Sequence, residues 1–106
     1  MDNNKSSFLN SPVEHIDITS FDSRPIIKAM SKMSFTSREV ANAAKIYNNM
    51  LSDKDCTIFF TIAGSTSAAG CMNLYSELVK NNMVDSIVAT GASILDIDFF
   101  EALGFK

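Results

Sequence analysis

The sequence predicts an α/β fold in which an incomplete βαβα unit follows an N-terminal extended and helical segment. Two apolar stretches rich in β-branched residues, 56–62 and a shorter one around 87–89 within 83–89, are typical of buried parallel strands. Each run is followed by a turn of small residues and then by apolar residues at helical spacing. Because parallel strands joined by helices pair through right-handed crossovers, this order favours a parallel sheet.

Size and charge exclude several classes of protein. The 106 residues suffice for one domain at most, and with 46% hydrophobic and 20% charged residues the chain can bury a modest core. The formal net charge of -3 provides no cationic surface for nucleic acid or for an anionic membrane, whereas a small cationic ligand is compatible with it. We therefore expect neither a nucleic acid nor a membrane as a partner.

Targeting signals and cysteine spacing bear on the cellular compartment. The polar N-terminus has no apolar core of signal-peptide length, and the most apolar run, 57–63, is too short to cross a bilayer. Cys56 and Cys71 form neither a metal-spaced pair nor a disulfide framework, and the lone His15 makes no zinc site. The sequence predicts a soluble, reduced, cytoplasmic protein without a metal ion.

Three segments precede the first long helix. Residues 1–11 are polar and predict a mobile leader. The alternation of apolar and polar residues over 13–18 predicts a short extended segment that lies against another part of the chain. A short helix is expected after Asp22 or Ser23, either of which can cap it, with Pro25 in its first turn.

The clearest helix is predicted to begin at Thr36 and to end in the polar turn after Leu51. Thr36 and Glu39 have the spacing of a capping box, in which the hydroxyl caps a backbone N–H and the carboxylate reaches back. Its expected apolar face consists of Val40, Ala43, Ala44, Tyr47 and Leu51. A last helix is expected over 94–103, with Gly104 as its C-cap.

The two small-residue turns are the candidate ligand site, because ligands of open parallel sheets bind beyond the carboxyl ends of the strands. In the turn 63–70 glycines allow close backbone approach, and three hydroxyl groups are available to a phosphate or a ribose. The turn lacks a P-loop lysine and the G-x-G-x-x-G pattern, so tight packing of strand against helix explains its small residues equally well. Beyond the turn 90–93, Asp96 either stabilises a helix N-terminus or meets a ribose hydroxyl or an amine, and spacing alone favours stabilisation.

Six runs of the sequence occur in a characteristic order. They are 12–18 (PVEHIDI), 55–60 (DCTIFF), 68–70 (AAG), 78–85 (LVKNNMVD), 87–92 (IVATGA) and 99–104 (FFEALG). Together they resemble the deoxyhypusine synthase family, and most of all its bacterial and archaeal deoxyhypusine-synthase-like branch. The resemblance covers nearly all of the chain after the leader.

The resemblance implies a Rossmann-like parallel sheet that binds NAD, in a homotetramer with active sites at subunit interfaces. Family members are several hundred residues long, so the chain is expected to be a partial sequence. It would hold the leader (1–11), an extended segment with a short helix (12–35) and the first part of the NAD-binding domain (36–106). The family's catalytic lysine lies in a later segment, so no catalytic residue is expected here, and Lys80 and Lys106 do not correspond to it.

The reaction implied by the resemblance is NAD-dependent transfer of the 4-aminobutyl group of spermidine to a lysine of a translation initiation factor, in the hypusine pathway. The residues that correspond to the family's NAD-contacting segments are Gly64, Ser65, Thr66, Ser67 and Ala68 in the first, and Thr90, Gly91 and Ala92 in the second. Asp96 lies where the eukaryotic enzymes have a glutamate that approaches both NAD and spermidine. Leu95 replaces a neighbouring acidic residue and keeps open transfer to a small amine, as in homospermidine synthesis. The missing lysine keeps open a non-catalytic oligomerisation or binding module.

Apolar surface is expected on the strand and helix faces. The residues that would form it are Phe59, Phe60, Phe99 and Phe100. The rest of the domain or a second subunit would cover this surface, because large apolar patches are rare on monomeric proteins.

Overall fold

The computed structural model describes residues 12–95, 99 and 102–104. The expected leader and Asp96 therefore lie outside the described residues. The elements in chain order are the 3-10 turn η2 (Ile18–Ser20), α1 (Arg24–Met30), α2 (Thr36–Ser52), β1 (Phe59–Ile62), the π-helical turn η3 (Ser67–Cys71), α3 (Met72–Lys80), β2 (Ser86–Ala89) and α4 (Gly91–Ile94). The order of strands and helices agrees with the predicted βαβα unit. The predicted bounds of the last helix, 94–103, are wrong at its start, because α4 begins at Gly91 and residues 91–93 of the predicted turn are helical.

The two strands pair in parallel, which confirms the α/β class and the strand direction. Phe59 of β1 lies opposite Ser86 of β2, and Ile62 lies opposite Ala89. Each strand has four residues. β1 is shorter than the run 56–62 that predicted it, whereas β2 contains the predicted residues 87–89. A two-stranded sheet in the described part of the chain is common to many α/β folds, so the Rossmann-like sheet stays a prediction.

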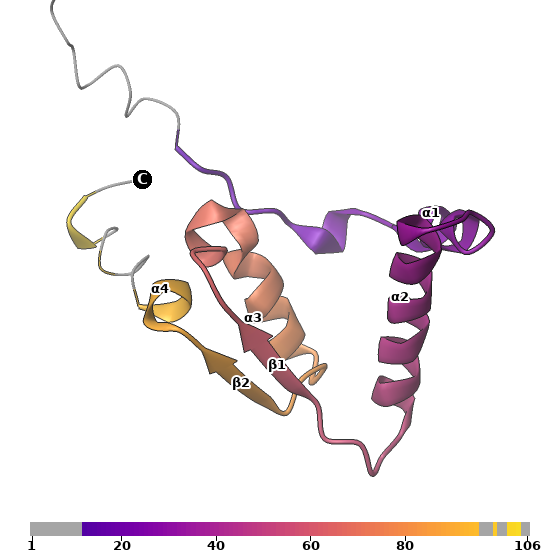
Figure 1. The fold of residues 1–106 in the computed structure, drawn as a ribbon. Helices are drawn as coiled ribbons and strands as arrows, with labels where there is room; N and C mark the ends of the chain where they lie inside the picture. Colours follow the sequence, from indigo (N-terminus) through magenta and orange to yellow (C-terminus); the bar gives the residue numbers. More distant parts are fainter. Residues whose placement is uncertain (1–11, 96–98, 100–101, 105–106) are drawn as a thin grey trace, which may run out of the picture.

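Helix α3 covers one face of this sheet, and the opposite face is open (Figure 1). On the covered face the rings of Phe60 and Tyr75 are 5.6 Å apart between centroids, and Ile62 is buried. Successive strand residues point to opposite faces, and on the open face 63% of Phe59 and 56% of Val88 are exposed. The prediction of strands buried on both faces is therefore wrong for the described residues, whereas the predicted apolar surface at Phe59 is confirmed.

The short helix α1 begins where the sequence predicts it, directly after Ser23 and with Pro25 in its first turn. Asp22 supports this start, since its carboxylate accepts hydrogen bonds from the backbone N–H and the guanidinium of Arg24. In Figure 1, α1 lies across the N-terminal end of α2. The two helices form a layer separate from the sheet.

Helix α2 begins at the predicted residue, but not through the predicted capping box. Thr36 is the first helical residue rather than the cap, and Phe35, with a left-handed φ of 54°, precedes it. The Glu39 N–H donates to the carbonyl of Phe35 over 3.2 Å, so a backbone carbonyl takes the place of the expected hydroxyl. The predicted apolar face is also shifted, because the buried residue is Ala41 and Val40 is exposed.

The extended segment that precedes η2 lies against the turn between β1 and α3. The Ile16 N–H donates to the Gly70 carbonyl over 3.0 Å. Gly70 has a φ of +104°, and a Cβ placed on it would lie 3.0 Å from the Glu14 carbonyl oxygen. Close contact between these backbones therefore requires glycine, and the predicted docking of 13–18 against another segment is confirmed.

The described residues bury little apolar surface. Their buried apolar side chains, each 6 or 7% exposed, are Ala41, Ile58 and Ile62. The radius of gyration is 17.7 Å, compared with about 13 Å for a compact domain of 100 residues. The fold is thus open, with small buried sites at Ala41 in α2 and at Ile58 and Ile62 in the strand layer.

Candidate functional site

The two small-residue turns lie together at one edge of the sheet. They follow β1 and β2, which are adjacent and parallel, so their carboxyl ends coincide. The Thr90 N–H donates to the Ile62 carbonyl over 3.2 Å, and the Ser93 hydroxyl donates to the Gly64 carbonyl. The second of these contacts joins the turns directly across 29 positions of sequence.

Ser93 is the residue that connects them, and sequence reasoning did not name it as a site residue. Only 1% of it is exposed. Its N–H donates to the Thr90 carbonyl over 3.0 Å, and its Oγ lies 3.3 Å from Thr90 Oγ1. The sequence signal that could have identified Ser93 is its spacing of three positions from Thr90 at a helix start. Hydroxyl side chains at such positions often form hydrogen bonds with the nearby backbone.

Both turns leave backbone open to a ligand. Gly64 has a φ of +79°, and a Cβ placed there would meet nothing within 4 Å. The same holds for Gly91, which has no positive φ. The backbone at these two residues is therefore open, as the glycines of the sequence predict.

The three hydroxyl groups of the first turn differ in environment. The Thr66 hydroxyl is hydrogen-bonded to the Tyr75 hydroxyl of α3, so it is held back against the helix. Ser67 is completely buried, and its Oγ has no hydrogen-bond partner among the described residues. Ser65 is exposed, as is the neighbouring Ala68.

The π-helical turn η3 links this loop to α3, where the sequence predicts an ordinary helix start. The Cys71 N–H donates to the Thr66 carbonyl over 3.1 Å, and Gly70 between them has a left-handed φ of 104°. A bond of this length around a left-handed glycine is the closure of a Schellman motif. The chain therefore kinks at Gly70 within η3, and α3 begins directly after the kink.

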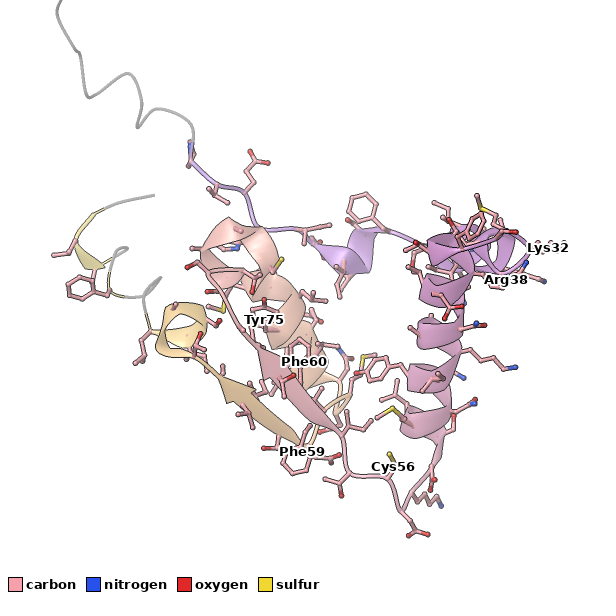
Figure 2. The ribbon with its side chains drawn as sticks, viewed as in Figure 1. Lys32, Arg38, Cys56, Phe59, Phe60 and Tyr75 are labelled. Atoms are coloured by element: carbon pink, nitrogen blue, oxygen red, sulfur yellow. The ribbon has the colours of Figure 1, made fainter. Side chains whose placement is uncertain are left out.

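The site is electrically neutral in its described part. The two turns contain neither lysine nor arginine. Figure 2 shows Lys32 and Arg38 at the end of the molecule formed by α1 and α2, away from α4. Lys80 of α3 is paired with Glu77 over 2.9 Å, and this hydrogen bond lowers the pKa of the Glu77 carboxyl. A negatively charged ligand would therefore meet no cationic side chain at the turns, and its donors there would be backbone N–H and hydroxyl groups.

An apolar groove of about 410 Å³ adjoins the turns. Its walls come from α3, from both strands and from the start of α4, with Ser93 at one end. Tyr75 lines the groove and also holds Thr66, so one residue contributes to both the groove and the first turn. No group of three potential metal ligands occurs among the residues that the structure describes.

The structure brings the predicted cofactor residues of both turns to one place, and their roles stay predictions. Gly64 and Thr90 lie in the hydrogen-bonded network around Ser93. Gly91 is exposed and Ala92 is half-buried at the start of α4. Asp96, the predicted contact for both NAD and spermidine, lies outside the described residues.

A parallel βαβα unit with two joined turns at its carboxyl edge defines the class, an α/β protein whose candidate ligand site lies at the strand ends. The family model described as deoxyhypusine synthase matches residues 25–106. The chain belongs to the deoxyhypusine synthase family, which confirms the resemblance drawn from its sequence.

Curated relatives support this membership. The chain is 66% identical over 102 residues to a deoxyhypusine synthase-like protein of Coxiella burnetii, covering 96% of this chain and 29% of that protein. It is 61% identical over 104 residues to one of Caulobacter vibrioides, covering 98% and 28%. It is 33% identical over 99 residues to probable deoxyhypusine synthase 2 of Methanosarcina acetivorans, covering 93% and 28%.

The chain thus spans less than a third of the length of these relatives. No solved structure matches it. Among the described residues, no helix is both long enough and apolar enough to cross a membrane.

Proposed function

We propose that the protein containing this chain is an NAD-dependent transferase that moves the 4-aminobutyl group of spermidine to a lysine of a translation initiation factor. The observation that carries the proposal is the hydrogen bond between Ser93 and Gly64. It joins the two turns that correspond to the family's NAD-contacting segments into one site. Because the chain spans 29% of its Coxiella relative, the proposal concerns the complete protein.

The residues present fit a dinucleotide at these turns. The open backbone at Gly64 and Gly91 permits close approach, and the exposed residues Ser65 and Thr90 carry hydroxyl groups that can offer polar contacts. The Ser67 hydroxyl, unpartnered among the described residues, is a further group whose hydrogen-bonding capacity is unused. The turns hold no cation, so phosphate groups would be held by backbone N–H groups at helix starts.

The residues that would hold the cofactor are therefore 64–68 and 90–92. Bound NAD supplies an acceptor for the hydride removed from the polyamine. The contribution of this chain is to bind and orient the cofactor and to exclude water beneath α3. The lysine that carries the aminobutyl group is proposed to lie outside residues 1–106.

The proposal is tested by titrating the complete gene product with NAD, followed by calorimetry. We expect saturable binding, and we expect Gly64→Val to abolish it because a branched side chain is strained at a φ of +79° and would occupy the open space. Asn42→Val, at an exposed polar position of α2, introduces the same side chain away from the turns and is the matched control that should leave binding intact. No binding of NAD to the wild-type protein would overturn the proposal.

The acceptor is identified by product analysis. Protein is incubated with NAD and spermidine together with either the initiation factor or putrescine, and the products are separated by mass spectrometry. Aminobutylation of the factor supports the proposed function. The second candidate is transfer to a small amine, which Leu95, two-thirds exposed where the eukaryotic enzymes have an acidic residue, keeps open. It is the result if only homospermidine forms. A binding module would give neither product.

A further inference from the structure

Ser93 makes three contacts that together fix the orientation of its hydroxyl. The side chain is almost completely buried at the junction of the two turns. Its Oγ contacts the Gly64 carbonyl oxygen and lies 3.3 Å from Thr90 Oγ1, while its N–H is bonded to the Thr90 carbonyl. A buried hydroxyl with two polar neighbours has no freedom to rotate without losing a hydrogen bond.

Counting protons assigns the donor of each hydrogen bond. A serine hydroxyl carries one proton, and a carbonyl oxygen can only accept. The Ser93 proton is therefore donated to the Gly64 carbonyl, and in the contact between the two hydroxyls Thr90 is the donor. Thr90 also has a single proton. Once this proton points to Ser93, the exposed side of Thr90 Oγ1 presents lone pairs alone.

We propose that Ser93 is a positioning residue that makes Thr90 a hydrogen-bond acceptor, so that the ligand group meeting Thr90 is a ribose hydroxyl of the dinucleotide and not a phosphate oxygen. This rests on the proposed function and names the part of the cofactor that the second turn recognises. The absence of lysine and arginine from both turns agrees with a neutral donor at this position. A phosphate oxygen there would face the lone pairs of Thr90 without a compensating cation.

The first experiment tests the bridge without any ligand. Backbone hydrogen exchange is measured by mass spectrometry in the complete gene product, comparing Ser93→Ala with Ser86→Ala. Ser86 is the first residue of β2, at the opposite end of the strand that leads to Ser93, and its side chain makes no hydrogen bond to the described residues. We expect faster exchange over 63–70 in Ser93→Ala alone. Equal exchange in both variants would overturn the bridge.

The second experiment tests the acceptor role through a ratio of affinities. NAD is compared with two analogues, each lacking the hydroxyls of one of its two riboses. We expect the wild-type protein to bind NAD about tenfold more tightly than one of the two analogues, because that analogue cannot make the hydrogen bond to Thr90. Thr90→Val should bring that ratio close to unity, and Thr90→Ser, which keeps the hydroxyl, should restore it.

Ser93→Ala distinguishes positioning from simple support of the fold. With Ser93 removed, Thr90 can rotate its proton outward, so the ratio is expected to fall severalfold. If Ser93→Ala weakens NAD and the analogue equally, Ser93 only supports the fold and the positioning role is wrong. If the wild-type protein binds no NAD, both the proposed function and the ribose assignment fail. Hydrogen exchange still tests whether the Ser93 hydroxyl holds the two turns together. If neither analogue binds more weakly than NAD, the function stands and the assignment is overturned.

Discussion

The Asp85 carboxylate accepts a hydrogen bond from the Ile58 backbone N–H over 2.7 Å, directly ahead of the paired strands. The Ile58 carbonyl in turn accepts from the N–H groups of Asp85 and Ser86, over 2.9 and 3.2 Å. Ile58 is buried, so its N–H would otherwise lack a partner in the interior. The Asp85 carboxylate thus provides the hydrogen-bond acceptor for Ile58, one residue before the first paired residue of β1.

Replacing Asp85 is expected to weaken the start of the sheet. Asp85→Ala removes the acceptor of a buried N–H and should lower the free energy of unfolding by about 1 to 2 kcal/mol. Asp85→Asn retains a carbonyl oxygen and should lose less. Urea unfolding followed by circular dichroism gives both values, and equal stability of Asp85→Ala and wild type would show that the contact does not contribute.

Tyr47 provides the hydrogen bond that connects α2 to the strand layer. Its hydroxyl donates to the Met83 carbonyl over 2.7 Å, across 36 positions of sequence. Tyr47→Phe should therefore cost about 1 kcal/mol of stability. Phe keeps the ring and its packing, so the loss measured in urea unfolding belongs to the hydroxyl.

The same residue predicts a dependence of stability on alkaline pH. Burial raises the pKa of the Tyr47 hydroxyl above its ordinary value of 10.0. The folded state therefore holds the proton more tightly than the unfolded state, and the resulting stability is present below pH 10.0 and is lost as the pH rises through the folded pKa. Wild type should lose more stability than Tyr47→Phe above that pH. Parallel pH profiles of the two proteins would contradict this.

Gly70 is expected to tolerate no side chain. Gly70→Ala places a Cβ 3.0 Å from the Glu14 carbonyl oxygen and strains a φ of +104°, so the extended segment should detach from the turn. Limited proteolysis within 13–18 is the measurement, and we expect cleavage several times faster than in wild type. Gly91→Ala is the matched control, since its added Cβ meets open space. Equal cleavage rates in the two variants would contradict the docking.

Local patterns of the sequence predict the order and type of the elements. Apolar periodicity and Pro25 place α1, α2 and the two strands because these signals act over a few neighbouring residues. The left-handed Phe35 and the π-helical turn could not be predicted, since both depend on how the chain turns against distant parts. The Ser93 contact with Gly64 is also long-range. The sequence predicts that both turns lie at the carboxyl edge of one sheet, and the fold adds the side-chain contact that joins them.

The open face of the sheet predicts a difference between the 106-residue chain and the complete protein. Phe59 is 63% exposed there, so Phe59→Ser should change the stability of the chain by less than about 0.5 kcal/mol, as at other surface sites. In the complete protein we expect a loss of about 2 kcal/mol or more, because a covering element would leave a cavity around the serine.

The covering element is identified by a further comparison on the same variant. If a second subunit covers Phe59, Phe59→Ser should lower the apparent mass of the complete protein in sedimentation at micromolar concentration. If the rest of the same chain covers it, the mass stays unchanged and only the unfolding free energy falls. Phe60→Ser is the internal reference, because Phe60 packs on Tyr75 beneath α3 and its loss should destabilise the 106-residue chain and the complete protein alike. If Phe59→Ser changes the unfolding free energy equally little in the 106-residue chain and in the complete protein, this apolar face stays exposed in the complete protein.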